Sequence, residues 1–249
     1  MTPDGTPGRD KLPPFRTAAL LLDLDGTLLD IAPTPDGVVV PAGLTDALVT
    51  IRDQLDGALA VITGRSIAEI DSLLGDAPHA VAGEHGGAVR PGPGVAIERP
   101  GLKAPPRSWL DRAAGLEAAH PGSLFERKPH GFGLHFRLAP EAGPAIHAVL
   151  SGLVAESEDF WLLPGHMVWE VVPRGVDKGR AVTDLMRRAP FLGRVPVFIG
   201  DDVTDEDGMR VARAMGGAGL RVQDVFGDAA GVRAWLYETA SRADWGESR

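Results

Sequence analysis

The sequence predicts an α/β fold, a doubly wound parallel sheet interrupted by a smaller inserted α+β module. Short apolar runs alternate with stretches of helical spacing at both ends of the chain, which favours a parallel sheet covered by helices. The middle of the chain instead combines two helical stretches with closely spaced runs typical of antiparallel strands. Acidic residues follow two of the apolar runs, at the edge where open α/β sheets bind ligands.

The first part of the chain alternates predicted strands and helices. The strands are Ala18–Asp23, Ala58–Ile62 and Ala80–Gly83, and the helices are Pro41–Gln54 and Ser66–Leu74. Ser66 is the expected N-cap of the second helix, since Glu69 follows at the spacing of a capping box. This βαβαβ order predicts parallel strands with right-handed crossovers.

The pattern changes after residues 91–106, whose many Pro and Gly residues predict a linker. Beyond it we expect helices over Ser108–His120 and Pro140–Glu156, and strands over Leu124–Lys128, Gly133–Leu138, Phe160–Leu163 and Met167–Val172. A turn at residues 165–166 would join the last two strands as a hairpin. The first pattern then resumes with helices Lys178–Arg188, Asp205–Met215 and Asp228–Ser241, and strands Val195–Ile199 and Gly219–Val222.

The predicted domain organisation follows from these changes of pattern. We expect a disordered leader at 1–17, a core domain in two parts at 18–104 and 174–241, an inserted α+β cap domain at 105–173, and a flexible tail at 242–249.

Composition narrows the class of protein. The chain has 249 residues, 44% of them hydrophobic, and a net charge of −9, which argues against nonspecific nucleic-acid binding. The absence of cysteine excludes disulfides and thiolate metal sites. Since no apolar stretch approaches the roughly 20 residues of a membrane span, we expect a cytoplasmic protein with neither a membrane nor a nucleic-acid partner.

Two carboxylates mark the end of the first predicted strand. Asp23 and Asp25 are two residues apart, so on a strand they would share one face, and Gly26 ends the strand just beyond them. Neighbouring carboxylates repel each other unless a cation or a shared proton relieves them. A hard divalent cation such as Mg²⁺, which takes oxygen ligands, is the expected partner.

Three further points fall at strand ends or helix starts: Thr63, Lys178, and the acids Asp201, Asp202 and Asp205. A cation held by carboxylates, a hydroxyl donor and an ammonium suit phosphoryl transfer, which needs positioning and charge neutralisation. Each point alone has an ordinary explanation as a turn, a helix cap, an acidic helix start or a solvated lysine. Only four of the 25 basic residues are lysines, however, and Lys178 is one of them.

The four points resemble the motifs of the haloacid dehalogenase superfamily of aspartate-nucleophile phosphatases. Asp23-Leu24-Asp25-Gly26-Thr27 is similar to the first motif, Thr63 to the second, Lys178 to the third and Gly200-Asp201-Asp202-Val203-Thr204-Asp205-Glu206 to the fourth. Further segments resemble the trehalose-phosphate phosphatase family within it. They are Gly83-Glu84-His85-Gly86, Glu126-Arg127-Lys128, His135-Phe136-Arg137, Gly165-His166-Met167-Val168-Trp169-Glu170 and Val176-Asp177-Lys178-Gly179.

The resemblance implies a fold, a reaction and a set of residue roles. It implies a Rossmann-like core, hydrolysis of trehalose 6-phosphate through an aspartyl-phosphate, and functional coupling to a trehalose-phosphate synthase. The implied catalytic residues are Asp23 as nucleophile, Asp25 as acid and then base, and Thr63 and Lys178 as phosphoryl ligands. The implied Mg²⁺ ligands are Asp23, the Asp25 carbonyl and Asp201, with Asp202 or Asp205 in support. The implied substrate-binding residues are Gly64, Arg65, His85 and Gly86 in the core and Glu126, Lys128, Arg137 and Glu170 in the cap.

Two positions depart from the family pattern, and other functions stay open. Thr63 stands where Ser is frequent, and Glu84 stands where Asn is usual, which exchanges a neutral donor for an acceptor. From the residues alone, the charges of the cap could equally form a cross-strand salt-bridge network on a solvent face. The alternative functions are another sugar-phosphate phosphatase, a phosphomutase, a receiver-type signalling domain and an inactive binding protein.

Overall fold

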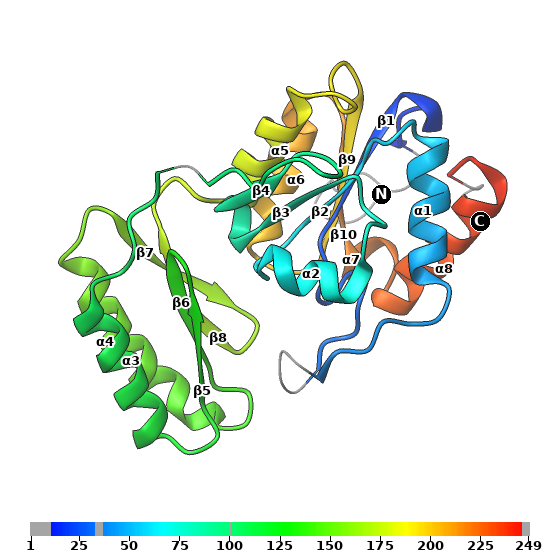
Figure 1. Cartoon of the computed structure of the whole chain (residues 1–249). Coiled ribbons are helices and arrows are strands. Elements are labelled where there is room, and N and C mark those ends of the chain that lie inside the picture. The colour runs from blue at the N-terminus through cyan, green and yellow to red at the C-terminus, as the bar shows by residue number, and fades with distance from the viewer. Residues whose placement is uncertain (1–10, 33–36, 100, 246–249) are drawn as a thin grey trace. The chain divides into compact units, whose positions relative to one another are not determined.

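The computed structural model describes residues 11–32, 37–99 and 101–245 and separates into two compact units (Figure 1). The first unit combines Met1–Glu98 with Asp177–Arg249, and the second is Arg99–Val176. The second unit thus begins and ends a few residues outside the cap boundaries expected from the sequence.

The first unit is built on a six-stranded sheet with the order β10-β9-β1-β2-β3-β4. Its strands are β1 (Ala18–Leu22), β2 (Leu59–Ile62), β3 (Ala80–Gly83), β4 (Ala88–Arg90), β9 (Val195–Gly200) and β10 (Ala218–Arg221). All neighbours pair in parallel except β3 and β4, which are antiparallel. Every residue of β1, β2 and β3 is buried, which explains their uniformly apolar sequences. The predicted doubly wound sheet is therefore confirmed.

Helices cover both faces of this sheet. They are α1 (Leu44–Gln54), α2 (Ile67–Leu74), α5 (Lys178–Met186), α6 (Asp205–Ala214), the short α7 (Val222–Val225) and α8 (Ala229–Arg242). Figure 1 shows α5 and α6 on one side of the strands and α1 and α8 on the other. The predicted capping box at the start of α2 is present, since Ser66 and Glu69 bond each other's backbone N–H groups. The starts of α2, α5 and α6 lie close to the segments that carry the predicted site residues.

The second unit packs two helices on one antiparallel sheet. The strand order is β5-β6-β8-β7, with β5 (Leu124–Lys128), β6 (Gly131–His135), β7 (Phe160–Gly165) and β8 (Val168–Pro173). The helices are α3 (Arg107–Ala119) and α4 (Gly143–Ala155), the latter preceded by a 3-10 turn at Pro140–Ala142. Phe132, Leu134 and Val171 face these helices in the core. The predicted α+β composition of the insertion is confirmed.

Two predicted elements of the second unit are displaced. Strand β6 spans Gly131–His135 instead of the predicted Gly133–Leu138, because Phe132 and Leu134 supply the inward positions opposite Val171 and Trp169. The hairpin turn between β7 and β8 is formed by residues 166–167 instead of 165–166, since Gly165 still pairs with Val168. Met167 takes the left-handed backbone conformation that this tight turn requires (φ 61°).

The chain ends are packed where the sequence predicts a leader and a tail. Phe15 is buried in a 3-10 turn (Phe15–Thr17) and meets the Trp245 ring edge-on at 4.7 Å between centroids. The Trp245 indole donates a hydrogen bond of 2.6 Å to the Pro13 carbonyl and stacks on Trp235. Residues 11–17 and 242–245 therefore differ from the expected disorder, because they contribute aromatic side chains to the core. Residues 1–10 and 246–249 lie outside the described part of the chain.

None of the helices in the described residues is both long enough and apolar enough to cross a membrane.

Candidate active site

A buried lysine joins two aspartates at the carboxyl end of the parallel sheet. Asp23 directly follows β1, Lys178 is the first residue of α5, and Asp205 is the first residue of α6. The Lys178 Nζ lies 2.7 Å from Asp23 Oδ1 and 2.6 Å from Asp205 Oδ1. All three residues are at most 4% exposed. The adjacent strands β1 and β9 bring these distant segments together.

Asp205 organises the turn that carries the neighbouring acids. Its second oxygen, Oδ2, accepts hydrogen bonds of 3.0 Å from the backbone N–H groups of Asp201 and Asp202. The Thr27 hydroxyl donates a bond of 3.2 Å to Asp23 Oδ2. Both carboxylates are therefore held from two sides, which fixes their oxygens before any ligand binds.

The site carries an excess of negative charge. Burial, together with the Asp205 carboxylate, raises the pKa of Asp23 well above its usual range, and Lys178 opposes this only in part. Burial and the nearby Asp205 charge raise the pKa of Asp201 to about 6. Burial disfavours the Lys178 ammonium, but the Asp205 and Asp23 carboxylates outweigh it and raise the pKa of Lys178. One ammonium thus stands among three carboxyl groups, and a further cation would relieve them.

The same carboxylates can hold a metal ion. Asp23, Asp201 and Asp205 each offer an oxygen, and these oxygens lie within 4.8 Å of one another. The Asp201 Oδ1 is buried without a hydrogen-bond partner among the described residues. Gly26, in the left-handed conformation (φ 80°), leaves room for this side chain, since a Cβ there would be 2.2 Å from Asp201 Oδ2. A buried oxygen without a donor and a hard oxygen donor set fit a hard divalent cation.

Asp25 lies outside this group of oxygens and is held by an arginine. The Arg65 Nε and Nη2 donate to Asp25 Oδ2 and Oδ1 at 2.6 and 2.8 Å. Arg65 also lies 3.4 Å from Glu69 Oε1, and its backbone N–H donates to the Thr63 hydroxyl at 3.3 Å. The β2–α2 turn that carries Thr63 therefore also orients the Asp25 carboxylate.

The segment after β3 packs against the turn that carries Thr63 and Arg65. Glu84 and His85 are both buried and both take left-handed backbone conformations (φ 54° and 57°). The His85 ring lies against Gly64, where a Cβ would be 2.6 Å from His85 Nε2. Gly86 in turn packs against Ala181 of α5, where a Cβ would be 3.1 Å from the alanine Cβ. The turn after β2 and the turn after β3 are therefore in direct contact.

In the second unit, charged side chains form a row across one face of the sheet. Lys128 Nζ lies 2.7 Å from Glu170 Oε2 and 3.8 Å from Glu126 Oε1, and Glu126 Oε2 lies 2.8 Å from His135 Nε2. Glu126 and Glu170 are both paired with Gly133 on the intervening strand. Because Gly133 has no side chain, the residues of β5 and β8 can reach each other above it.

The row is largely buried, which distinguishes it from a network on a solvent face. The side chains of Lys128 and Glu170 are 8% and 11% exposed. Burial opposes the charge of Glu126, but the hydrogen bond with His135 and the Lys128 charge outweigh it and lower the pKa of Glu126. Arg137 is placed near the hairpin turn, where its Nη2 donates to the His166 carbonyl at 3.1 Å.

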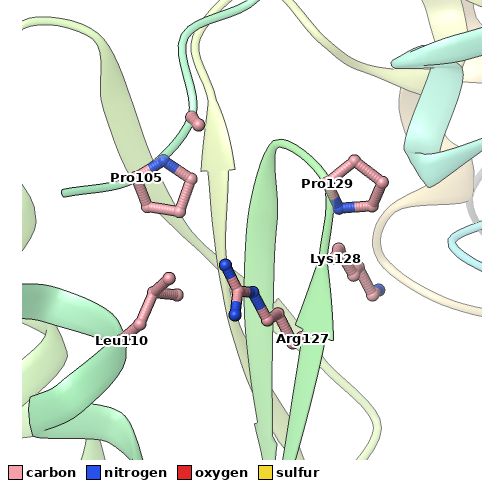
Figure 2. A pocket seen from close by; sticks show the side chains of 6 residues that line it. Pro105, Leu110, Arg127, Lys128 and Pro129 are labelled. Carbon is pink, nitrogen blue, oxygen red and sulfur yellow. The ribbon is translucent and has the colours of Figure 1, made fainter. Parts of the chain in front are cut away.

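The neighbouring residue Arg127 points to the opposite side of β5. Figure 2 shows its guanidinium directed toward Pro105 and Leu110, and Lys128 directed away from them. These residues, with Ala104 and Pro129, line a pocket of about 360 Å³. The alternation along β5 thus places Glu126 and Lys128 on one face and Arg127 on the other.

Comparison with known proteins identifies the family. A model of the trehalose-phosphatase family matches residues 21–231. The trehalose-6-phosphate phosphatase of Escherichia coli (strain K12) is 38% identical over 206 residues, which cover 82% of this chain and 77% of that protein. The chain belongs to the trehalose-phosphatase family. A probable trehalose-phosphate phosphatase of Sinorhizobium fredii (strain NBRC 101917 / NGR234) is 36% identical over 205 residues, with 82% and 77% covered.

The fold is shared with solved structures. The C-terminal domain of Candida albicans trehalose-6-phosphate phosphatase superposes with a TM-score of 0.78 at 20% identity, covering 91% of this chain and 93% of that one. The core is thus the haloacid dehalogenase fold with an inserted α+β unit, as the sequence predicts for this family.

The geometry sorts the residues that the resemblance to this family implies. It groups Asp23, Lys178 and Asp201 with Asp205, which the resemblance implies as one of two alternatives, Asp202 or Asp205. The Asp202 carboxylate instead accepts a 2.6 Å bond from the Val203 N–H, and among the described residues it is not a member of the acidic group. The contact between Asp25 and Arg65 and the bond from Thr27 to Asp23 were missed, because neither the spacing nor the motif indicates where these side chains point.

Proposed function

We propose that the protein hydrolyses trehalose 6-phosphate to trehalose and inorganic phosphate, the last step of trehalose biosynthesis. Its membership of the trehalose-phosphatase family supports this substrate, and the names of the two bacterial relatives contain it. The observation that carries the reaction is the bridge from Lys178 to Asp23 and Asp205, with Asp201 alongside, at the ligand-binding edge of the sheet. The Lys178 ammonium contacts two carboxylates while a third lies beside them, so the negative charge of the group exceeds what one lysine neutralises.

In the proposed reaction Asp23 is the nucleophile. Its carboxylate oxygen forms a bond to phosphorus while the bond from phosphorus to the sugar oxygen breaks. Asp25 gives its proton to the leaving sugar oxygen and later takes one from the water that attacks the aspartyl-phosphate. The Thr63 hydroxyl and the Lys178 ammonium hold the phosphoryl oxygens, so that charge developing on them is neutralised.

Mg²⁺ is the cation that we propose for the site. Asp23 and Asp201 would hold it with the Asp25 main-chain carbonyl, supported by Asp205 or Asp202. When bound, it supplies charge neutralisation and orients the phosphoryl group. A hard divalent ion with oxygen ligands is consistent with the donor set.

We further propose that the second unit recognises the sugar. Glu126, Lys128, Arg137 and Glu170 offer charged donors and acceptors of the kind that adjacent hydroxyl groups bind. Their support is the buried row itself, because the desolvation of charged groups offsets much of what their mutual attraction contributes to stability, so a role in binding explains why the row is there. We also propose Gly64, His85 and Gly86 as contacts from the core. The cytoplasmic location and a coupling to a trehalose-phosphate synthase stay predictions.

The substitution Asp23→Asn tests the reaction. It removes the nucleophilic oxygen but keeps the size of the side chain, so we expect phosphate release to fall by at least about 10³-fold. Acid quenching after reaction with ³²P-labelled substrate should trap a labelled protein in the wild type and none in the variant. If the variant released phosphate at a rate near that of the wild type, with an unchanged circular dichroism spectrum, the assignment of Asp23 would be wrong.

A further inference from the structure

The contact between Asp25 and Arg65 fixes the orientation of the Asp25 carboxylate. Arg65 donates to both oxygens of the same carboxylate, at 2.6 and 2.8 Å. A guanidinium has five N–H donors and no acceptor, so an Asp25 oxygen turned toward it accepts a hydrogen bond and donates none there. In this arrangement both oxygens of Asp25 are therefore acceptors, as a general base requires.

The position of Arg65 is itself fixed by its own turn. Its backbone carbonyl accepts a 2.9 Å bond from the Glu84 N–H, and its N–H bonds the Thr63 hydroxyl. Its Nη1 lies 3.4 Å from Glu69, whose other oxygen accepts bonds from the Ser66 hydroxyl and N–H at 2.6 and 3.0 Å. The Arg65 side chain is only 11% exposed. A side chain held in this way can orient Asp25 at little entropic cost.

We propose that Arg65 is a positioning residue for the second half of the reaction, in which the phosphorylated Asp23 is hydrolysed. This inference rests on the proposed function. In that step the oxygen of water bonds to phosphorus, and the bond from phosphorus to the Asp23 oxygen breaks, returning its electron pair to the carboxylate. The proton of the water passes to Asp25, whose carboxylate Arg65 holds in place by contacts to both of its oxygens. In the first half Asp25 has to donate a proton to the leaving sugar oxygen, and an oxygen turned toward Arg65 cannot do so. The contact therefore has to open in that half, and Arg65 contributes little to it.

Aryl phosphates separate this role from binding of the sugar. Phenyl, 4-nitrophenyl and 2,4-dinitrophenyl phosphate carry no sugar hydroxyls, and their phenols are progressively better leaving groups. For each, kcat/KM reports the steps up to formation of the phosphorylated protein, while kcat also includes its hydrolysis. With Arg65→Gln we expect kcat to fall about 10- to 100-fold, at or below the lower end of general-base contributions, because the base is misplaced and not removed. The kcat/KM for 2,4-dinitrophenyl phosphate should stay within about twofold of the wild-type value.

Two further readouts follow from slow hydrolysis of the intermediate. In Arg65→Gln the three aryl phosphates should converge on one common kcat, because the shared second step limits all of them. Rapid mixing should show a burst of phenolate approaching about one per protein molecule. In the Asp25→Asn background, Arg65→Gln should cause no further loss, since a positioning residue has no effect once its target is removed.

Matched variants separate position from charge and from fold. Arg65→Lys keeps the charge but loses the two-pronged contact, so it should show the same burst with a smaller fall in kcat. It also provides the test if Arg65→Gln does not fold. Arg90→Gln removes another arginine paired with an aspartate, Asp71, and should leave both constants unchanged.

Other outcomes would overturn the proposal. An equal fall in kcat/KM for all three aryl phosphates would assign Arg65 to the phosphoryl group or to the fold. Unchanged aryl constants with a raised KM for trehalose 6-phosphate would assign it to the sugar. If the wild-type protein released phosphate from none of these compounds, the proposed function would itself fail, and this inference with it.

Discussion

Lys178 Nζ lies 2.7 Å from Asp23 Oδ1, although 155 positions separate the two residues in the chain. The parallel pairing of β1 with β9 and the start of α5 create this contact. Because both side chains are buried, we expect the contact to contribute to the stability of the fold as well as to the reaction.

The substitution Lys178→Met should therefore destabilise the fold as well as abolish turnover. It leaves Asp23 and Asp205 as buried carboxyl groups without their cation, and removing one partner of a buried pair costs about 3–5 kcal/mol. Lys103→Met is the control, because the pair of Lys103 with Asp159 is solvent-exposed and should contribute at most about 1 kcal/mol. Urea denaturation measures both variants, and equal free energies of unfolding for them would contradict the account.

Cation binding should strengthen as the pH rises. The pKa of Asp201 is raised to about 6, and burial raises that of Asp23 as well. A cation competes with these protons, so below pH 6 the apparent affinity for Mg²⁺ should weaken about tenfold per pH unit for each proton displaced. Isothermal titration between pH 5 and pH 8 measures this, and a pH-independent affinity would show that these carboxyl groups do not bind the ion.

Without a divalent cation the same groups should make stability fall as pH rises. Carboxyl groups with a raised pKa hold protons in the folded state at a pH where the unfolded chain, with a value near 3.8, has lost them. The free energy of unfolding should therefore decrease between about pH 4 and pH 6 in the presence of EDTA. Addition of Mg²⁺ should raise the melting temperature more at pH 7.5 than at pH 5, and the reverse order would contradict this sign.

Gly26→Ala should disturb the cation site in particular. Its Cβ would lie 2.2 Å from Asp201 Oδ2, so the Asp201 carboxylate has to move. Gly43 has nearly the same φ (79°) but nothing within 4 Å of its virtual Cβ, so Gly43→Ala imposes the same backbone strain without the clash. We expect Mg²⁺ affinity to fall at least about tenfold in Gly26→Ala only. Changes to residues that position a metal ligand typically lower metal affinity by that much. Equal affinities in both variants would remove Asp201 from the site.

Glu170→Gln should affect sugar phosphates selectively. It removes the negative charge of the carboxylate that lies 2.7 Å from Lys128 Nζ and that we propose binds the sugar. We expect KM for trehalose 6-phosphate to rise about tenfold, in line with the loss of one charged hydrogen bond, while the constants for 4-nitrophenyl phosphate stay unchanged. Glu141→Gln, at an exposed position, is the control. An unchanged KM in Glu170→Gln would return the row to a purely structural role.

The fold could largely be predicted because its signals are local. The five consecutive apolar residues of β1 indicate that the strand is buried on both faces. The capping box of Ser66 and Glu69 indicates where α2 begins. Strand β4 was not predicted because its three residues, Ala88–Arg90, are too few to show an alternating pattern. The bounds predicted for β6 were wrong because its glycines obscure the alternation that places Phe132 and Leu134 in the core. The packing of the chain ends was not predicted because Phe15 and Trp245 are far apart in the sequence and meet only in the folded protein.

The candidate site was predictable in its residue types but not in its contacts. The order of the motifs indicates that Asp23, Lys178 and Asp201 meet at one edge of the sheet. It does not indicate that Asp205 rather than Asp202 faces Lys178, because that depends on which side of the turn each carboxylate points to. Nor does it indicate that Arg65 grips Asp25, since nothing in the spacing fixes a long side chain.

The most direct test of the account is phosphate release, with Mg²⁺ and with EDTA, from trehalose 6-phosphate, sucrose 6-phosphate, glucose 6-phosphate and 4-nitrophenyl phosphate. We expect a strong preference for trehalose 6-phosphate, measured as kcat/KM, and loss of turnover in EDTA. Turnover of only the aryl or another sugar phosphate would contradict the assignment of the second unit's residues to trehalose. No release from any of them would contradict the phosphatase reaction itself and favour a mutase or a receiver-type function.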